Sequence, residues 1–153
     1  GDLSLRLMGG VADAAAPMPF LYNLRGTYST RLPVAGTNVF ETMRPDEFLA
    51  DHYAAIHLKH SFGNLLIETK HFRPRPAVVS SVAFGDLARP ENHEGLSFTP
   101  IQGGYYESGL LIENLLRSGF SSFGVGAFYR YGPYALPDFK DNVAVKATMG
   151  FAF

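Results

Sequence analysis

Two glutamates, Glu107 and Glu113, are the residues of this chain that come closest to a catalytic pair, because they share one face of a predicted strand. Glycosidases hold two carboxylic groups about 5 to 9.5 Å apart. At about 3.3 Å per residue, six residues of strand separate these two side chains by roughly 20 Å. The spacing therefore argues against joint acid–base catalysis by the two carboxylates.

Three histidines, His52, His57 and His60, could suggest a metal site. Side chains alternate between the two faces of a strand, so His57 lies on the face opposite the other two. A zinc site needs its ligands to converge on one point. We therefore expect these histidines to be solvated or interfacial, with no bound metal and no other cofactor.

Other catalytic signatures are also missing from the sequence. The run Gly124-Val125-Gly126 is too short for a phosphate-binding loop, and small side chains facing a crowded interior explain it. No serine lies in a Gly-x-Ser-x-Gly motif. The absence of cysteine excludes disulfides and thiol chemistry. We predict no catalytic residues and a protein that is not an enzyme.

The segment 70–75 is basic and carries Phe72 between its charges, a pattern that could indicate nucleic-acid binding. The net charge of −1, however, provides no long-range field for a polyanion. Contact with lipid headgroups or with solvent explains the segment better. We therefore expect no nucleic-acid partner.

The C-terminal segment 141–153 predicts the strand around which the fold is organised. Its alternate positions are apolar: Val143, Val145, Ala147, Met149, Phe151 and Phe153. Period two is typical of a strand with two unlike faces. A tilted strand of about 10 residues crosses a bilayer. The segment therefore resembles a membrane strand, and its aromatic positions Phe151 and Phe153 are candidates for a barrel-insertion signal.

The same alternation predicts five further strands and the connections between them. The strands span 2–9, 51–62, 77–86, 104–116 and 121–132. The connections are 10–50, 63–76, 87–103, 117–120 and 132–140. Long and short connections alternate, so 10–50, rich in glycine and proline, is expected to be a long extracellular loop.

A membrane barrel and a soluble lipocalin-like barrel would both show this alternation. Only 18% of the residues are charged, and the polar faces hold small residues with isolated lumenal charges at Glu107, Glu113, Arg130 and Lys146. Phe123 and Tyr131 share a face eight residues apart, roughly 26 Å of strand, which approaches the roughly 25 Å apolar band of outer-membrane barrels. We predict an all-β, antiparallel transmembrane β-barrel region over residues 1–153.

Several stretches resemble the surface-antigen (BamA/TamA/FhaC-like) barrel superfamily. These are 51–62, 105–114 and the Leu24-Arg25-Gly26-Thr27 run of the long loop, which is similar to a Val/Ile-Arg-Gly-Phe/Tyr tip although Thr27 replaces the aromatic. The nearest resemblance is to Bacteroidota outer-membrane proteins that carry a carboxypeptidase-regulatory-like N-terminal domain. The resemblance implies a Gram-negative cell outer membrane, a lipid environment and assembly by the barrel assembly machinery.

The resemblance also implies a lock inside the barrel. In that superfamily the loop folds back into the lumen, where its arginine meets a carboxylate on a neighbouring strand. Carried over to this chain, Arg25 beside Gly26 would pair with Asp86 of the Phe84-Gly85-Asp86 run. The alternative leaves Arg25 in solvent and Asp86 at a strand end.

Six strands cannot close a barrel, and open edges in lipid leave backbone groups unpaired. The resemblance implies that these strands join the remaining strands of a larger barrel, such as a 16-stranded one, with a role in inserting, exporting or scaffolding envelope proteins. The alternative is a small structural or adhesive barrel of eight strands, completed by two weak strands within 20–40. A soluble lipocalin-like ligand-binding barrel remains a third hypothesis.

Overall fold

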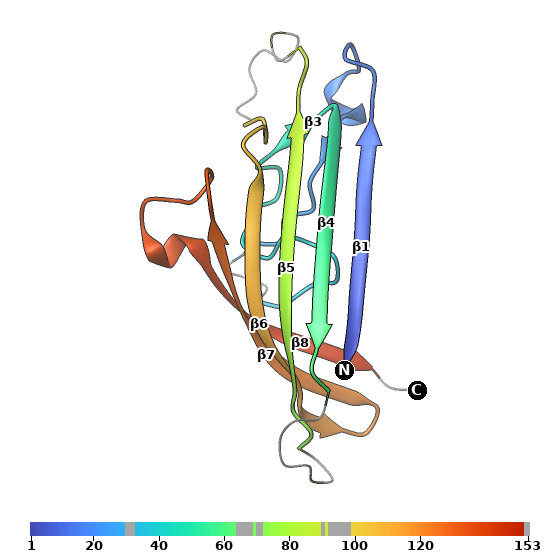
Figure 1. Cartoon of the computed structure of the whole chain (residues 1–153), viewed down its shortest axis with the longest axis vertical. Helices are drawn as coiled ribbons and strands as arrows, with labels where there is room; N and C mark the ends of the chain where they lie inside the picture. The colour runs from blue at the N-terminus through green and yellow to red at the C-terminus, as the bar shows by residue number, and fades with distance from the viewer. Residues whose placement is uncertain (30–32, 64–68, 70–71, 90, 92–98, 152–153) are drawn as a thin grey trace.

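The computed structural model, which describes residues 1–29, 33–63, 69, 72–89, 91 and 99–151, is all-β. Its main element is a six-stranded antiparallel sheet in the order β1-β4-β5-β6-β7-β8 (Figure 1). The strands are β1 (Asp2–Val11), β4 (His52–Ser61), β5 (Arg75–Asp86), β6 (Tyr105–Ser118), β7 (Ser121–Tyr131) and β8 (Val143–Phe151). All six predicted strands are confirmed, although Phe153 lies outside the described residues.

Each strand of the sheet pairs with the next long strand along the chain, so the sheet is a meander. Successive connections therefore lie at opposite ends. The connections 12–51, 87–104 and 132–142 share one end, while 62–74 and the turn at Gly119 share the other. The start of β1 and the end of β8 also lie at the second end (Figure 1). The predicted alternation of long and short connections is confirmed by this topology.

The two faces of the sheet are unlike. The outer face exposes large apolar side chains from every strand, including Leu3, Leu5, Leu7, Ile56, Leu58, Val78, Phe84, Leu110, Ile112, Val125, Val145 and Met149. The opposite, concave face carries buried polar and charged side chains: His57, Ser81, Glu107, Arg130 and Lys146. Because Ser4 of β1 and Thr148 of β8 line one cavity, the sheet curls until its two edge strands face a common space.

The core lies between the concave face and the long connection after β1. In its main cluster, Leu24, Phe40, Met43 and Phe48 of this connection pack against the sheet at Ala55 and Ala83 and against Ile101 and Tyr105. Small alanines on the strands leave room for the larger side chains of the loop, so the two surfaces fit at close packing. Residues 24, 40–43 and 48–51 of the connection are therefore buried in the fold.

Short elements within the connection do not extend the main sheet. The 3-10 helix η1 (Met18–Phe20) precedes β2 (Tyr22–Asn23), which pairs with β3 (Leu49–Ala50) in a separate two-stranded sheet. A second 3-10 helix, η3 (Phe139–Asn142), precedes β8. Among the described residues of 20–40, only the two-residue strand β2 occurs, so the two additional long strands of the eight-stranded alternative are not found there. None of the helices in the described ranges is long and apolar enough to cross a membrane.

β1 and β8 are the edges of the main sheet, and the registers of the described strands do not join them. The edge of β8 is covered at one point, where Ala147 N donates to Pro33 O (2.6 Å) and Ala35 N donates to Ala147 O (2.8 Å). The sheet is thus curved and open, with a local cap from its own loop on β8.

Candidate functional site

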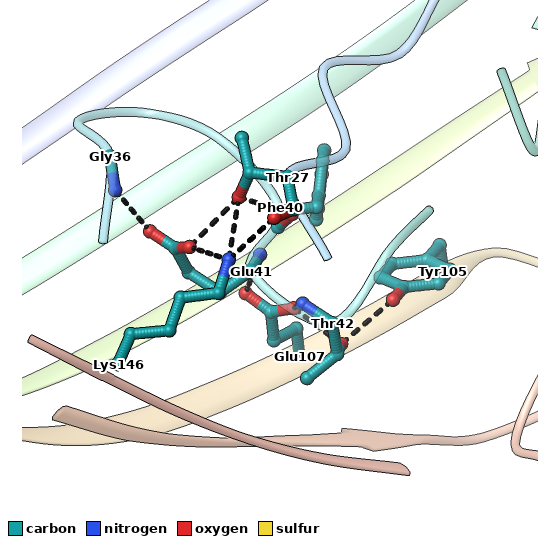
Figure 2. Close-up of polar contacts among 8 residues, drawn as sticks. All are labelled: Thr27, Gly36, Phe40, Glu41, Thr42, Tyr105, Glu107 and Lys146. Atoms are coloured by element: carbon teal, nitrogen blue, oxygen red, sulfur yellow. Dashed lines mark hydrogen bonds and ion pairs between the residues drawn. The ribbon is translucent and has the colours of Figure 1, made fainter. Parts of the chain in front are cut away.

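The part of the long connection from residue 24 to residue 50, called here the inner loop, is fixed to the concave face by a buried polar cluster (Figure 2). The strand residues of the cluster are Tyr105, Glu107 and Lys146, and the loop residues are Thr27, Gly36, Phe40, Glu41 and Thr42. Period two places Glu107 and Lys146 on the concave side of β6 and β8, so both point at the loop.

Glu107 holds the loop by its backbone. Its carboxylate accepts hydrogen bonds from the N–H groups of Glu41 (2.9 Å) and Thr42 (2.6 Å) and from the Thr42 hydroxyl. Tyr105 OH lies 2.8 Å from the same hydroxyl. Two successive N–H groups that converge on a carboxylate make a strong anion site, and burial strengthens each bond. Glu107 therefore fixes the loop at residues 41–42.

Lys146 forms the second attachment. Its ammonium lies 2.6 Å from Glu41 Oε2 and also donates to Thr27 O (2.8 Å) and Thr27 Oγ1 (2.9 Å). Glu41 accepts further bonds from Gly36 N (2.7 Å) and Thr27 Oγ1 (2.8 Å). Both charged side chains are almost fully buried, at 2% and 3% exposure. A buried ion pair with this many additional hydrogen bonds compensates the desolvation of both charges.

Arg130 of β7 forms the third attachment. One of its guanidinium nitrogens lies 2.7 Å from Glu47 Oε1. The guanidinium also lies over the rings of Tyr105 (4.9 Å) and Phe48 (5.9 Å). Cation–π contacts of this kind stabilise a desolvated cation. Three inward-pointing strand residues, Glu107, Arg130 and Lys146, thus hold successive parts of one loop.

The structure places the four charged residues that were predicted to face a lumen on the concave face of the sheet. Glu107, Arg130 and Lys146 contact the inner loop, whereas Glu113 pairs with Lys59 of β4 at 2.5 Å. The separation of roles agrees with the sequence expectation that the two glutamates do not act together. Phe151 is exposed on the outer face.

The predicted pairing of Arg25 with Asp86 is not formed. Asp86 accepts bonds from Gln102 Nε2 (2.5 Å) and Leu87 N (2.7 Å), and the Arg25 side chain is exposed. Gly26 does serve the loop, because a Cβ there would collide with the backbone oxygens of Met43 and Arg44. The loop is therefore held through Glu107 and Lys146. Of the Arg-Gly pair, only Gly26 is needed for the loop, because it allows the backbone to pass close to residues 43–44.

Sequence reasoning missed the partners that the loop supplies, above all Glu41 and Thr42. It also missed a contact of 2.9 Å between His57 Nδ1 and Ser81 Oγ. This pair is buried beside Phe40 and lines a cavity of ≈ 180 Å³. Within the described part of the chain no carboxylate is hydrogen-bonded to His57, so the pair lacks the third member of a nucleophilic triad.

Among the residues that the structure describes, no group of three or more histidines, cysteines, aspartates or glutamates could hold a metal ion. The site thus consists of the partly buried inner loop and the strand residues that hold it. Comparison with known protein families, curated proteins and solved structures finds no match to this chain.

Proposed function

We propose that this chain is part of a non-enzymatic outer-membrane β-barrel with an internal plug. The observation that carries the proposal is the inverted polarity of the sheet. On β8, the apolar Val145 is 62% exposed while the adjacent Lys146 is 2% exposed. A water-soluble sheet buries its apolar face and exposes its charges, whereas a bilayer reverses this preference.

The exposed apolar side chains extend across all six strands, which is far more than the scattered hydrophobic residues of a soluble surface. Aromatic residues stand at both ends of this surface. Phe123 and the stacked pair Phe120–Phe151 lie at the end where β1 starts and β8 ends, and Tyr129 and Tyr131 lie at the other. Two aromatic girdles around an apolar band are typical of outer-membrane barrels.

The open edges of β1 and β8 point to further strands. In hydrocarbon, each unpaired N–H or C=O group costs several kcal/mol, so the edges require strand partners. We therefore propose that the six strands join the remaining strands of a larger barrel. The inner loop, which is fixed to the strands at Glu107 and Lys146, would occupy the lumen of that barrel. It would lie near the end of the sheet at which the connection 12–51 leaves β1 and enters β4.

The surface-antigen resemblance supports a role in inserting, exporting or scaffolding envelope proteins, in the outer membrane of Gram-negative bacteria. The partners of the proposed protein are outer-membrane lipid and, during biogenesis, the barrel assembly machinery. A loop folded into the interior of the sheet agrees with what that resemblance implies.

The test uses the full-length protein, expressed in a Gram-negative host and extracted with detergent. Folded membrane barrels resist dodecyl sulfate at room temperature, so the unboiled protein is expected to migrate differently from the boiled protein on a gel. Recovery in the outer-membrane fraction is the second expected result. A protein that is recovered without detergent and shows no heat-dependent shift would contradict the proposal and favour the soluble barrel.

A further inference from the structure

Three cavities follow one another along the concave side of the sheet. The first cavity, of ≈ 300 Å³, lies between β1 and β4 on one side and residues 22–25, 38 and 40 on the other. The second cavity, of ≈ 180 Å³, is bounded by residues 35–39 at the tip of the inner loop and by the strands. The third cavity, of ≈ 440 Å³, reaches the turn between β6 and β7.

Neighbouring cavities share wall residues, so each cavity adjoins the next. Asn38 and His57 line both the first and the second cavity. Glu113 and Thr148 line both the second and the third. The first cavity lies near the start of β4, and the third lies at the opposite end of the sheet. The series therefore leads along the sheet past the inner loop.

The position of the first cavity follows from how the inner loop is attached. Glu107, Arg130 and Lys146 hold the loop by polar contacts to β6, β7 and β8. On the β4 side the loop makes a ring contact, in which the centroid of Phe40 lies 4.9 Å from that of His57. The first cavity thus lies beside β1 and β4, away from these polar attachments.

The wall of the second cavity is suited to hold water. Its volume exceeds the roughly 30 Å³ that one water molecule occupies in the liquid. Hydroxyl groups line it at Thr37, Ser81 and Thr148. The paired side chains of Lys59 and Glu113 also line it and are 37% and 31% exposed. Polar cavities of this size hold water, whereas apolar constrictions lose it.

The junction between the first and the second cavity is formed by a strand residue and a loop residue. His57 of β4 is fixed, because its Nδ1 lies 2.9 Å from Ser81 Oγ and its ring packs on Phe40. Asn38 comes from the loop tip and has a φ of 55°, a left-handed conformation that asparagine adopts more readily than most residues. A movement of the anchored loop would therefore change the width of this junction.

We propose that this series of cavities conducts small hydrophilic solutes, including hydrated ions, past the inner loop. The inference rests on the proposed function, because only a barrel within a membrane separates two compartments. The inner loop narrows the path at Asn38 and His57 without closing it. Polar walls that carry both signs of charge, such as Lys59 and Glu113, allow hydrated ions of either sign to pass.

The test measures ionic current through the full-length protein in a planar lipid bilayer between potassium chloride solutions. The chain contains no cysteine, so an introduced thiol is unique within it. Asn38→Cys and Thr148→Cys place a thiol at each of the two places where neighbouring cavities meet. A charged methanethiosulfonate reagent should lower the unit conductance of each variant by about twofold or more, because the attached group occupies the path. Val145→Cys on the outer face and the unsubstituted protein should show no change.

Glu107→Ala provides a second readout of the same path. Release of the inner loop should widen the junction and raise the unit conductance by about twofold or more. The proposal is overturned if protein with the heat-dependent gel shift carries no current. It is also overturned if the reagent leaves the current of both Asn38→Cys and Thr148→Cys unchanged, since the ions then take another route. A protein without the gel shift disproves the barrel itself, and conduction with it.

Discussion

The Glu107 carboxylate accepts hydrogen bonds from both the N–H and the hydroxyl of Thr42, a residue 65 positions earlier in the chain. The inner loop there has no neighbouring strand to accept its N–H groups, and buried N–H groups must be paired. Glu107 takes the place of that missing strand. The position of the loop at residues 41–42 therefore depends on one side chain of β6.

Replacing Glu107 with alanine should loosen the inner loop. The substitution leaves the N–H groups of Glu41 and Thr42 unpaired, which costs about 2 kcal/mol or more. If cleavage follows local opening, this cost corresponds to roughly thirtyfold faster chymotryptic cleavage after Phe40, which is buried beside Glu41. Glu113→Ala is the matched control, because it removes the same charge from the same face without touching the loop. Equal cleavage rates in the two variants would disprove the anchoring role of Glu107.

The buried pair of Lys146 and Glu41 should show strong energetic coupling. Lys146→Met alone leaves a buried carboxylate without its cation, which costs about 3 to 5 kcal/mol. Adding Glu41→Gln removes that unpaired charge, so the double variant should be less destabilised than the sum of the two single variants. The measurement is a double-mutant cycle on the free energy of unfolding in urea, read from the heat-dependent gel shift. Additive costs would mean that the two side chains do not interact.

The roles of Arg25 and Gly26 in the inner loop can be distinguished by mutation. Gly26→Ala places a Cβ against the backbone oxygens of Met43 and Arg44, so the loop must move apart. We expect a loss of more than about 1 kcal/mol, because backbone cannot yield as a flexible side chain does. Arg25→Ala removes an exposed side chain and should change stability by less than about 0.5 kcal/mol. Thermal unfolding of both variants decides the point, and a larger loss from Arg25→Ala would restore the arginine as the lock.

The sequence was sufficient for the sheet because strand periodicity is a local signal. Alternation along β6, β7 and β8 identified both the strands and the side on which Glu107, Arg130 and Lys146 lie. The loop partners were not predictable in this way, because Glu41 and Thr42 meet the strands only through long-range contacts. The short resemblance at Arg25 suggested a different lock. A usable signal was nevertheless present, since buried charges on a strand require buried partners elsewhere.

The opposite exposure of neighbouring residues on β8 gives a direct test of which medium surrounds the sheet. Val145 is 62% exposed on the outer face, whereas Thr148 lines the cavity on the concave face. In a bilayer, an arginine at an outward position near the midplane costs about 2 to 4 kcal/mol. In water, an arginine at the same exposed position would cost little.

Val145→Arg should therefore reduce membrane insertion strongly, while Thr148→Arg should be tolerated, because its guanidinium can extend into the cavity toward Glu113. The measurement is the fraction of full-length protein that shows the heat-dependent gel shift in outer membranes. Thr148→Lys is a second test of the concave face. Its long cation should be tolerated as the arginine is, because the same cavity offers it space and the Glu113 carboxylate. If Val145→Arg inserts as well as Thr148→Arg does, hydrocarbon does not contact the outer face. The inverted polarity of the sheet would then require a protein partner that covers it.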